Sequence, residues 1–293
     1  MEKLYEYVEN LFRNELETNI YSALIIGFVE ASLKDLNGDL QLYHDKRKEL
    51  KRKRLEDLYT FYSRVVTEYF CDLFKRNIRN NSLIEKLLEE ARSWINDIFE
   101  TTCKIFNIVF LVNIETKTKL TICTRNPYMP LEVGVAWHPY FNLPYIPSTS
   151  LKGLMKSYFL LNDIKICGLN TLDLFGSKEY KGILTFFDAL PSSFKNSLID
   201  PDVLTPHYQE IGGKIDEKSV KPRPLVYPVI SSGVKFSTII AVDLSNVDID
   251  SKTFINEFQY HLNKAFFIGV GARTTLGYGV VKVRIINVKE DIG

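Results

Sequence analysis

The chain has 293 residues, enough for one large or two modest domains. Hydrophobic residues make up 45% of it and aromatic residues 13%, which is ample for a packed core and excludes global disorder. Its 37 basic and 36 acidic residues nearly cancel, so histone-like binding of nucleic acid through net charge is also excluded. A local basic surface remains compatible with this composition.

The apolar runs are too short for a membrane-spanning helix, which needs about 20 residues. The longest are residues 20–29 and 105–112, and the first 13 residues lack the apolar core of a signal peptide. No CxxC pair and no histidine at zinc-finger spacing occurs among the four cysteines, Cys71, Cys103, Cys123 and Cys167. We therefore expect reduced core cysteines, no metal or cofactor, and a cytoplasmic protein without a membrane partner.

Residues 1–100 have the spacing of amphipathic helices. Apolar side chains recur every three or four positions within residues 4–16, 55–70 and 84–98. Proline is absent from the first 126 residues, and glycine occurs there only at Gly27 and Gly38. Because so few breakers interrupt the pattern, we expect an all-helical N-terminal region over residues 1–103.

Seven of the nine residues from 46 to 54 are basic. This run suits a phosphate-facing or partner-facing patch, and it also suits a solvated helix face balanced by neighbouring acids. Residues 1–100 carry 16 bases and 19 acids, whereas the remaining residues carry 21 and 17. The C-terminal part is therefore the better candidate for an anionic partner.

After residue 103, segments rich in β-branched and aromatic residues alternate with helical ones. Four segments are predicted to be strands, namely residues 105–123, 182–188, 236–244 and 279–288, the first of them a hairpin that turns at residues 115–119. Residues 150–161 and 254–267 are predicted to be helices. This order predicts an α+β domain over residues 104–293 with a ferredoxin-like (RRM-like) core, a common RNA-binding platform.

The segment before the first of these helices carries hydroxyls where a helix begins. Prolines give an extended entry into Ser148, Thr149 and Ser150, and Lys152 follows within the first turn. Unpaired N–H groups and the helix dipole favour an anion there, so these side chains are candidate phosphate ligands. N-capping by Ser148 or Thr149, with Lys152 in solvent, explains the same residues.

A glycine-rich loop, residues 268–279, joins the last predicted helix to the last strand. It contains four glycines and three donor side chains, namely Gly269, Gly271, Gly277, Gly279, Arg273, Thr274 and Thr275. It is not a dinucleotide fingerprint, because Thr274 stands where a third glycine is needed, and it lacks the Gly-Lys-Ser/Thr of a P-loop. A structural turn explains one or two glycines but four poorly, so we predict close contact with a phosphate backbone.

A long insertion separates the strand that ends near residue 188 from the one that begins near residue 236. It contains Thr205-Pro206-His207-Tyr208 and a proline-rich stretch over residues 218–228. Long ordered insertions usually have a function. His207 and Tyr208 are candidates for stacking on a base, and His207 for proton transfer, although a histidine bonded within its own loop is an equally good explanation.

Together these segments resemble a known family. Residues 145–153, YIPSTSLKG, resemble the IPGSSLKG element of the RAMP superfamily, the RNA-binding proteins of CRISPR systems, with Ser148 where glycine is common. Residues 269–279 are similar to its glycine-rich loop, and residues 174–176 with 182–188 are similar to its middle element. TPHY at 205–208 resembles the PHY signature of the family formed by the sixth subunit of type III-B Cmr effector complexes.

The resemblance implies an RRM-like core with a thumb hairpin, here about residues 200–235, that displaces a nucleotide of the guide–target duplex. It implies that Ser148, Ser150, Lys152, Arg273 and Thr274 contact phosphates of a CRISPR RNA. The expected role is in antiviral defense: a subunit that caps the 3′-end side of the backbone filament, beside a backbone and a terminal RAMP subunit and in contact with target RNA.

Related backbone subunits cleave target RNA with an aspartate in a loop that corresponds here to residues 124–147. This segment contains Glu132 and no aspartate, so we expect a non-catalytic subunit. A metal-independent endoribonuclease that processes CRISPR RNA precursors is the alternative, with His44, His138 or His207 as general base. A protein-interaction scaffold acting through the helical region is a third possibility.

Overall fold

The structure is a computed structural model that describes residues 19, 21–27, 29, 60, 62–68, 70–75, 81–126, 129–205, 209–211, 214–216 and 224–290. Residues 21–27 and 62–68 are helical, as predicted for the second apolar run. The first apolar run, the basic run at 46–54 and residues 206–208 lie outside the described residues.

The centre of the molecule is an antiparallel sheet with the strand order β11-β1-β10-β4. The long strands are β1 (Ile108–Thr116), β10 (Lys235–Val242) and β11 (Val281–Glu290). The short strands β4 (Leu184–Phe186) and β5 (Leu190–Ser193) both pair with β10. In core numbering this is the order 4-1-3-2 of a ferredoxin-like fold, so the predicted fold class is confirmed.

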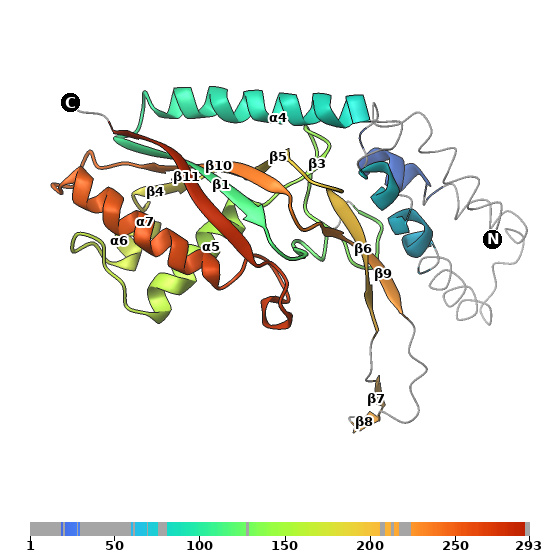
Figure 1. Cartoon of the computed structure of the whole chain (residues 1–293). Helices are drawn as coiled ribbons and strands as arrows, with labels where there is room; N and C mark the ends of the chain where they lie inside the picture. The colour runs from blue at the N-terminus through green and yellow to red at the C-terminus, as the bar shows by residue number, and fades with distance from the viewer. Residues whose placement is uncertain are drawn as a thin grey trace, which may run out of the picture.

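Two helices cover one face of this sheet, as the sequence predicted. They are α5 (Ser148–Leu161) and α7 (Ser251–Phe267), and the short α6 (Thr171–Phe175) lies beside them (Figure 1). The α7 helix begins where the Asp250 carboxylate accepts the Thr253 N–H at 2.8 Å. Phe258 of α7 stacks on Phe110 of β1 with 4.9 Å between ring centroids, so the even-numbered residues of β1 face the helices.

A further helix, α4 (Asn81–Thr102), packs on the opposite face against β5, β10 and β1 (Figure 1). It ends close to the predicted change of character at residue 103. Its buried residues Leu88 and Ala91 nevertheless belong to the same hydrophobic cluster as the core strands. The division into two domains therefore stays a prediction, because α4 and the sheet share one core.

The chain beyond β1 does not form the predicted hairpin. Instead, Leu120 bridges Ile230, and Thr121 bridges Ala272 of the glycine-rich loop. The predicted turn at residues 115–119 is wrong because both edges of β1 are already paired, one with β10 and the other with β11.

The insertion forms a two-stranded arm that extends away from the sheet (Figure 1). We call it the hairpin arm: β6 (Ile199–Leu204) pairs with β9 (Leu225–Ile230), and β7 (Gln209–Ile211) pairs with β8 (Lys214–Asp216). Another short pair, β2 (Trp137–His138) and β3 (Leu143–Pro144), precedes α5. The range of the hairpin arm corresponds to the insertion expected at about residues 200–235.

All four cysteines are free. Cys71 and Cys103 are buried, but Cys123 is exposed, so the expectation of core positions is wrong for that residue. Within the described residues, no helix combines the length and the hydrophobicity that crossing a membrane requires. The same residues contain no group of three or more His, Cys, Asp or Glu side chains placed to hold a metal ion.

Candidate nucleic-acid interface

The start of α5 is capped by a carboxylate from elsewhere in the chain. Pro147 occupies the N-cap position and makes no side-chain cap. The Ser148 N–H donates to Asp188 Oδ1 at 2.6 Å, while the N–H groups of Ser150 and Leu151 both donate to the Pro147 carbonyl. The interpretation that Ser148 or Thr149 caps the helix is therefore wrong. Pro147 is the N-cap residue, so both hydroxyls lie inside the first turn.

This cap changes what the helix N-terminus can bind. The Asp188 carboxylate already takes one of the first N–H groups, and it stabilises the positive end of the helix dipole. A phosphate that approached the same N–H groups would meet this negative charge. The hydroxyls remain accessible, since Thr149 is exposed and Ser148 and Ser150 are half-buried.

Lys152 lies near two other positive charges, Lys156 of the same helix and Lys181 of the segment between α6 and β4. Burial lowers the pKa of Lys152, and the nearby charges of Lys156 and Lys181 lower it further. Lys156 Nζ donates to the Gly176 carbonyl at 2.9 Å. Within the described residues none of these three amines forms a salt bridge, so the cluster has positive charge that an anion can compensate. We call Lys152, Lys156 and Lys181 the α5 lysine cluster.

The glycines of the glycine-rich loop all have positive φ, between 70° and 104°. A Cβ at Gly279 would lie 1.9 Å from the Val270 carbonyl oxygen, and one at Gly271 would lie 2.4 Å from that of Thr121. At Gly277 the space within 4 Å is empty. The shape of the loop thus accounts for all four glycines, and our premise that a turn explains four poorly was wrong. Phosphate contact here remains a prediction, now supported by the side chains alone.

Arg273 is held against the hairpin arm. Its own φ is 62°, and its Nη1 donates to the Tyr227 hydroxyl of β9. The guanidinium carbon lies 5.3 Å from the centroid of the Tyr227 ring and 5.8 Å from that of Tyr278. The next residues form the short 3-10 helix η2 (Thr274–Leu276), in which Thr275 is exposed and Thr274 is half-buried. Arg273 therefore connects the loop to the arm and is not a free cation in solvent.

The same junction contains an acid that the sequence analysis missed. Tyr278 Oη donates to Asp202 Oδ2 at 2.5 Å, and Lys119 Nζ lies 3.3 Å from Asp202 Oδ1. Burial of Asp202 opposes ionisation, but hydrogen bonds from Tyr278 and the Val203 N–H, with Lys119 nearby, hold its pKa below the usual range. The hydrogen bond to Asp202 raises the pKa of Tyr278. No local spacing marks these residues, since they come from three distant segments.

The His138 ring is hydrogen-bonded to the backbone of its own turn. Its Nδ1 accepts the N–H groups of Tyr140 and Phe141, each at 3.3 Å, in the turn between β2 and β3. Burial lowers the pKa of His138. Glu132 accepts the Thr60 hydroxyl at 2.9 Å. The remaining candidates lie outside the described residues, namely His44, His207 and Tyr208.

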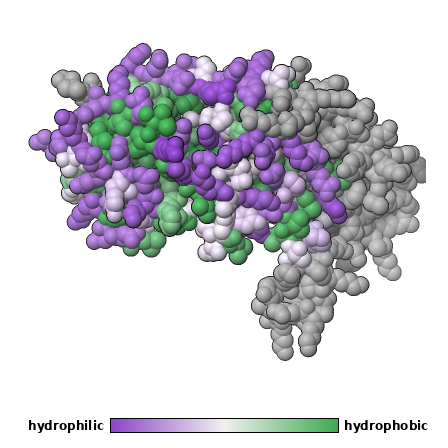
Figure 2. All heavy atoms as spheres, in the orientation of Figure 1, coloured by the Kyte–Doolittle hydropathy of each residue, from purple (hydrophilic) through white to green (hydrophobic). Residues whose placement is uncertain are grey.

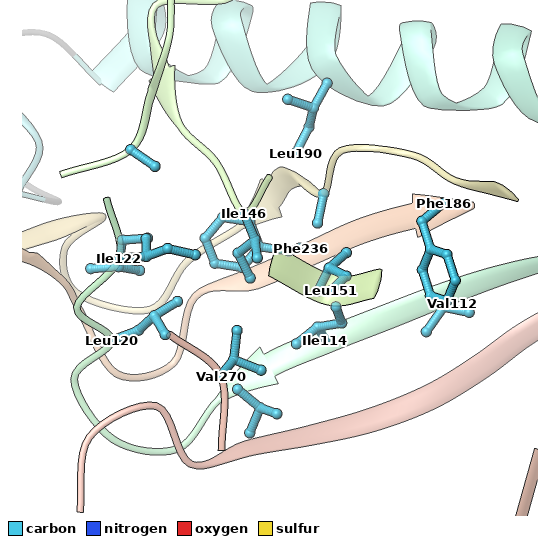
Figure 3. Packing of buried hydrophobic residues seen from close by; sticks show 14 of the residues in the cluster. Val112, Ile114, Leu120, Ile122, Ile146, Leu151, Phe186, Leu190, Phe236 and Val270 are labelled. Carbon is cyan, nitrogen blue, oxygen red and sulfur yellow. The ribbon is translucent and has the colours of Figure 1, made fainter. Parts of the chain in front are cut away.

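The structure brings the predicted segments to one end of the core. Figure 3 shows that Ile146 and Leu151, at the start of α5, lie in the same buried group as Val270 of the glycine-rich loop. Leu120 and Ile122, from the segment after β1, join this group. Since Leu120 also bridges Ile230 of β9, the base of the hairpin arm lies at the same end.

The chain is similar to known proteins over most of its length. A family model described as the RAMP superfamily matches residues 127–282. The CRISPR system CMR subunit Cmr6 of Saccharolobus solfataricus is 26% identical over 239 residues, which cover 81% of this chain and 76% of that protein. A chain in a cryo-EM structure of the type III-B Cmr-beta complex bound to cognate target RNA superposes with a TM-score of 0.71 at 23% identity, over 99% of both chains. A crystal structure of Cmr6 from Pyrococcus furiosus gives a TM-score of 0.39 at 17% identity, over 62% of this chain and 100% of that one.

Proposed function

Because the chain belongs to the RAMP superfamily, we propose that it is an RNA-binding subunit of a type III-B Cmr effector complex, with a CRISPR RNA as its ligand. The observation that carries the proposal is the α5 lysine cluster, which has no salt bridge among the described residues. Two of its three lysines lie on the first core helix, in a chain that is similar to Cmr6 over most of its length. Target RNA and neighbouring RAMP subunits are the further partners.

The contacts are directed at phosphates. Lysine amines pair with phosphate oxygens as point charges, and hydroxyls add hydrogen bonds that do not depend on base identity. Lys152 supplies the charge, and Ser148, Thr149 and Ser150 supply the hydroxyls. Because such contacts do not distinguish bases, sequence specificity is left to base pairing between guide and target.

The glycine-rich loop contributes its outer side chains. Arg273 orients the loop against the hairpin arm, and Thr274 and Thr275 offer donors on the side away from the core. Gly269 and Gly271 give the loop its shape, because a Cβ at Gly269 would meet the Thr274 side chain and one at Gly271 would meet the Thr121 carbonyl.

The chain is further proposed to cap the 3′-end side of the backbone filament, with the hairpin arm as the thumb that enters the guide–target duplex. The arm supports this role because it extends well beyond the sheet (Figure 1). His207 and Tyr208, which fall in the sequence between β6 and β7, are proposed to stack on a displaced base.

The subunit is proposed to be non-catalytic. The environments of His138 and Glu132 support this, since each already binds within the protein. The check is incubation of the purified chain with repeat RNA and with target RNA, in EDTA and in Mg²⁺. Intact RNA is the expected result. Cleavage in EDTA that His207→Ala abolishes would replace this proposal with the processing endoribonuclease.

The main experiment is purification of the tagged full chain from its own host, with sequencing of the retained RNA and mass spectrometry of the retained proteins. Guide-length RNAs with repeat-derived tags, together with other RAMP proteins, are expected. The double variant Lys152→Ala/Lys156→Ala is expected to lose most of the RNA, whereas Lys86→Ala/Lys252→Ala, two exposed lysines elsewhere, retains it. Wild-type protein free of both RNA and RAMP partners would overturn the proposal.

A further inference from the structure

Among the described residues, the elements that pack on the second face of the sheet, opposite α5 and α7, cover it only in part. Odd-numbered residues of β1 point to this face, since Phe110 points to α7. At one end α4 packs over it, and Val109, Ile239 and Ala241 are fully buried. At the other end, Asn113 is only half-buried. The register places this uncovered end at the starts of β10 and β11.

The uncovered end is polar and basic. A shallow groove there is lined by residues of the three long strands, namely Asn113, Glu115, Lys235, Lys282, Arg284 and Ile286. Figure 2 looks onto the edge of the sheet formed by β11. It shows mostly hydrophilic atoms over the middle of the visible surface. We call these six residues, with Lys117 and Lys195 beside Glu115, the open-face patch.

The open-face patch contains five basic side chains and one acidic side chain. Glu115 is the acid, and its Oε1 lies 2.8 Å from Lys117 Nζ and 3.8 Å from Lys195 Nζ. The other three bases, Lys235, Lys282 and Arg284, have no ion pair within the part of the chain that the structure describes. In a chain whose total charges nearly cancel, such a local excess calls for an anionic partner.

The chemistry of the patch favours a sugar-phosphate backbone over a protein surface. Protein interfaces are centred on apolar and aromatic side chains and are depleted in lysine. Here the large apolar residue of the groove is Ile286, at 55% exposure, among cations and the hydrogen-bonded pair of Ser237 and Asn113. Lysine, arginine, serine and asparagine are the usual donors to phosphates.

The patch also adjoins the glycine-rich loop. The Lys117 N–H donates to the Val280 carbonyl at 2.7 Å, directly after that loop and before β11. We propose that the open-face patch binds the backbone of single-stranded RNA, as a second contact surface on the opposite side of the sheet from α5. This inference rests on the proposed function and extends the RNA path around the end of the sheet.

The test is the affinity of the full chain for a fluorescent 20-nucleotide oligouridine over a series of salt concentrations. The triple variant Lys235→Ala/Lys282→Ala/Arg284→Ala is expected to bind roughly tenfold or more weakly, with a salt slope lower by about 2, because each lost phosphate contact removes about 0.7. The control Lys86→Ala/Lys104→Ala/Lys252→Ala changes the net charge equally at exposed positions elsewhere and is expected to stay within about twofold.

Equal RNA affinities of the two triple variants would overturn the proposal that the open-face patch binds RNA. If Lys152→Ala then still weakens binding, the proposed function stands and the further inference alone fails. No RNA binding by the wild type would overturn both. An acidic partner is tested with a fluorescent polyglutamate peptide: a loss in the patch variant that is seen with the peptide and not with RNA also overturns the inference. The glutamine triple at the same positions, which keeps polar side chains, must reproduce the loss of RNA affinity.

Discussion

The start of α5 and the glycine-rich loop lie at the same end of the core, but their charges are used differently. On α5 the lysines have no salt bridge within the described residues, and the anion at the helix start is the protein's own Asp188. In the loop, the cation Arg273 is already bound to Tyr227 of the hairpin arm. The first segment can therefore bind a ligand with little effect on the fold, whereas the second largely maintains the fold.

This difference separates affinity from stability. Replacing Lys152 should weaken RNA binding and leave the free energy of unfolding almost unchanged, whereas Lys156 also bonds the Gly176 carbonyl. Residues of the glycine-rich loop should affect unfolding first, and RNA binding only through the position of the loop and arm. Each prediction below tests one side of this comparison, from the largest expected effect to the smallest.

Gly279→Ala is expected to destabilise the protein by about 3 kcal/mol or more, because the new Cβ would lie 1.9 Å from the Val270 carbonyl at a positive φ. Gly277→Ala is the matched control: its φ is also positive, but the space around it is empty, so a cost of about 1 kcal/mol is expected. Urea unfolding of both variants gives the comparison. Equal costs would show that the close approach of the backbone does not constrain this loop.

Lys152→Ala is expected to weaken RNA binding roughly tenfold, or about 1.5 kcal/mol, as for loss of one charge-assisted contact. Its melting temperature should stay close to that of the wild type, since Lys152 forms no salt bridge among the described residues. Fluorescence anisotropy with oligouridine and a thermal melt provide the two readouts, with the exposed Lys178→Ala as control. A lower melting temperature with unchanged affinity would reverse the comparison.

Arg273→Ala is expected to cost about 1–2 kcal/mol of stability, through loss of one hydrogen bond and two cation–π contacts. Arg273→Lys should recover little of this, because an ammonium cannot reproduce the planar stacking of the guanidinium. Chemical unfolding measures both variants. A variant with wild-type stability and a large loss of RNA affinity would instead make Arg273 a direct phosphate ligand.

Asp188→Asn keeps an acceptor for the Ser148 N–H but removes the negative charge at the helix start. We expect a stability cost of about 0.5–1 kcal/mol from the weaker cap and dipole interaction. RNA affinity should rise by roughly twofold to fivefold, since a nearby phosphate no longer meets a carboxylate. Weaker binding would mean that Asp188 positions the RNA site and does not compete with it.

The smallest effect concerns pH and the hairpin arm. The pKa of Asp202 is lowered in the folded state, so its ionised form contributes stability above the unfolded pKa of about 4. That contribution is lost as the pH falls through the lower, folded pKa. Asp202→Asn should therefore show a shallower loss of stability between about pH 4 and pH 2 than the wild type. Parallel curves from acid titrations of the two proteins would contradict this linkage.

Much of the fold could be predicted because it depends on local pattern. The three- and four-residue spacing of apolar side chains located α5 and α7, and the β-branched runs located β10 and β11 to within a few residues. Their order along the chain was sufficient for the ferredoxin-like topology, since few arrangements satisfy it. The hairpin predicted after β1 is wrong because local polarity cannot show that both edges of a strand are already paired. The short strands β2, β3 and β5 were not predicted.

The candidate site was predictable only as a set of segments. The sequence by itself determined that hydroxyls and a lysine begin α5 and that glycines with an arginine precede β11, because those are properties of consecutive residues. Only the tertiary structure decided that Asp188 caps α5, that Arg273 binds Tyr227 and that Lys235 and Lys282 share an open face. These pairs are separated by 40 to 47 positions, and a hydrogen bond or a shared charged surface depends on distance in space.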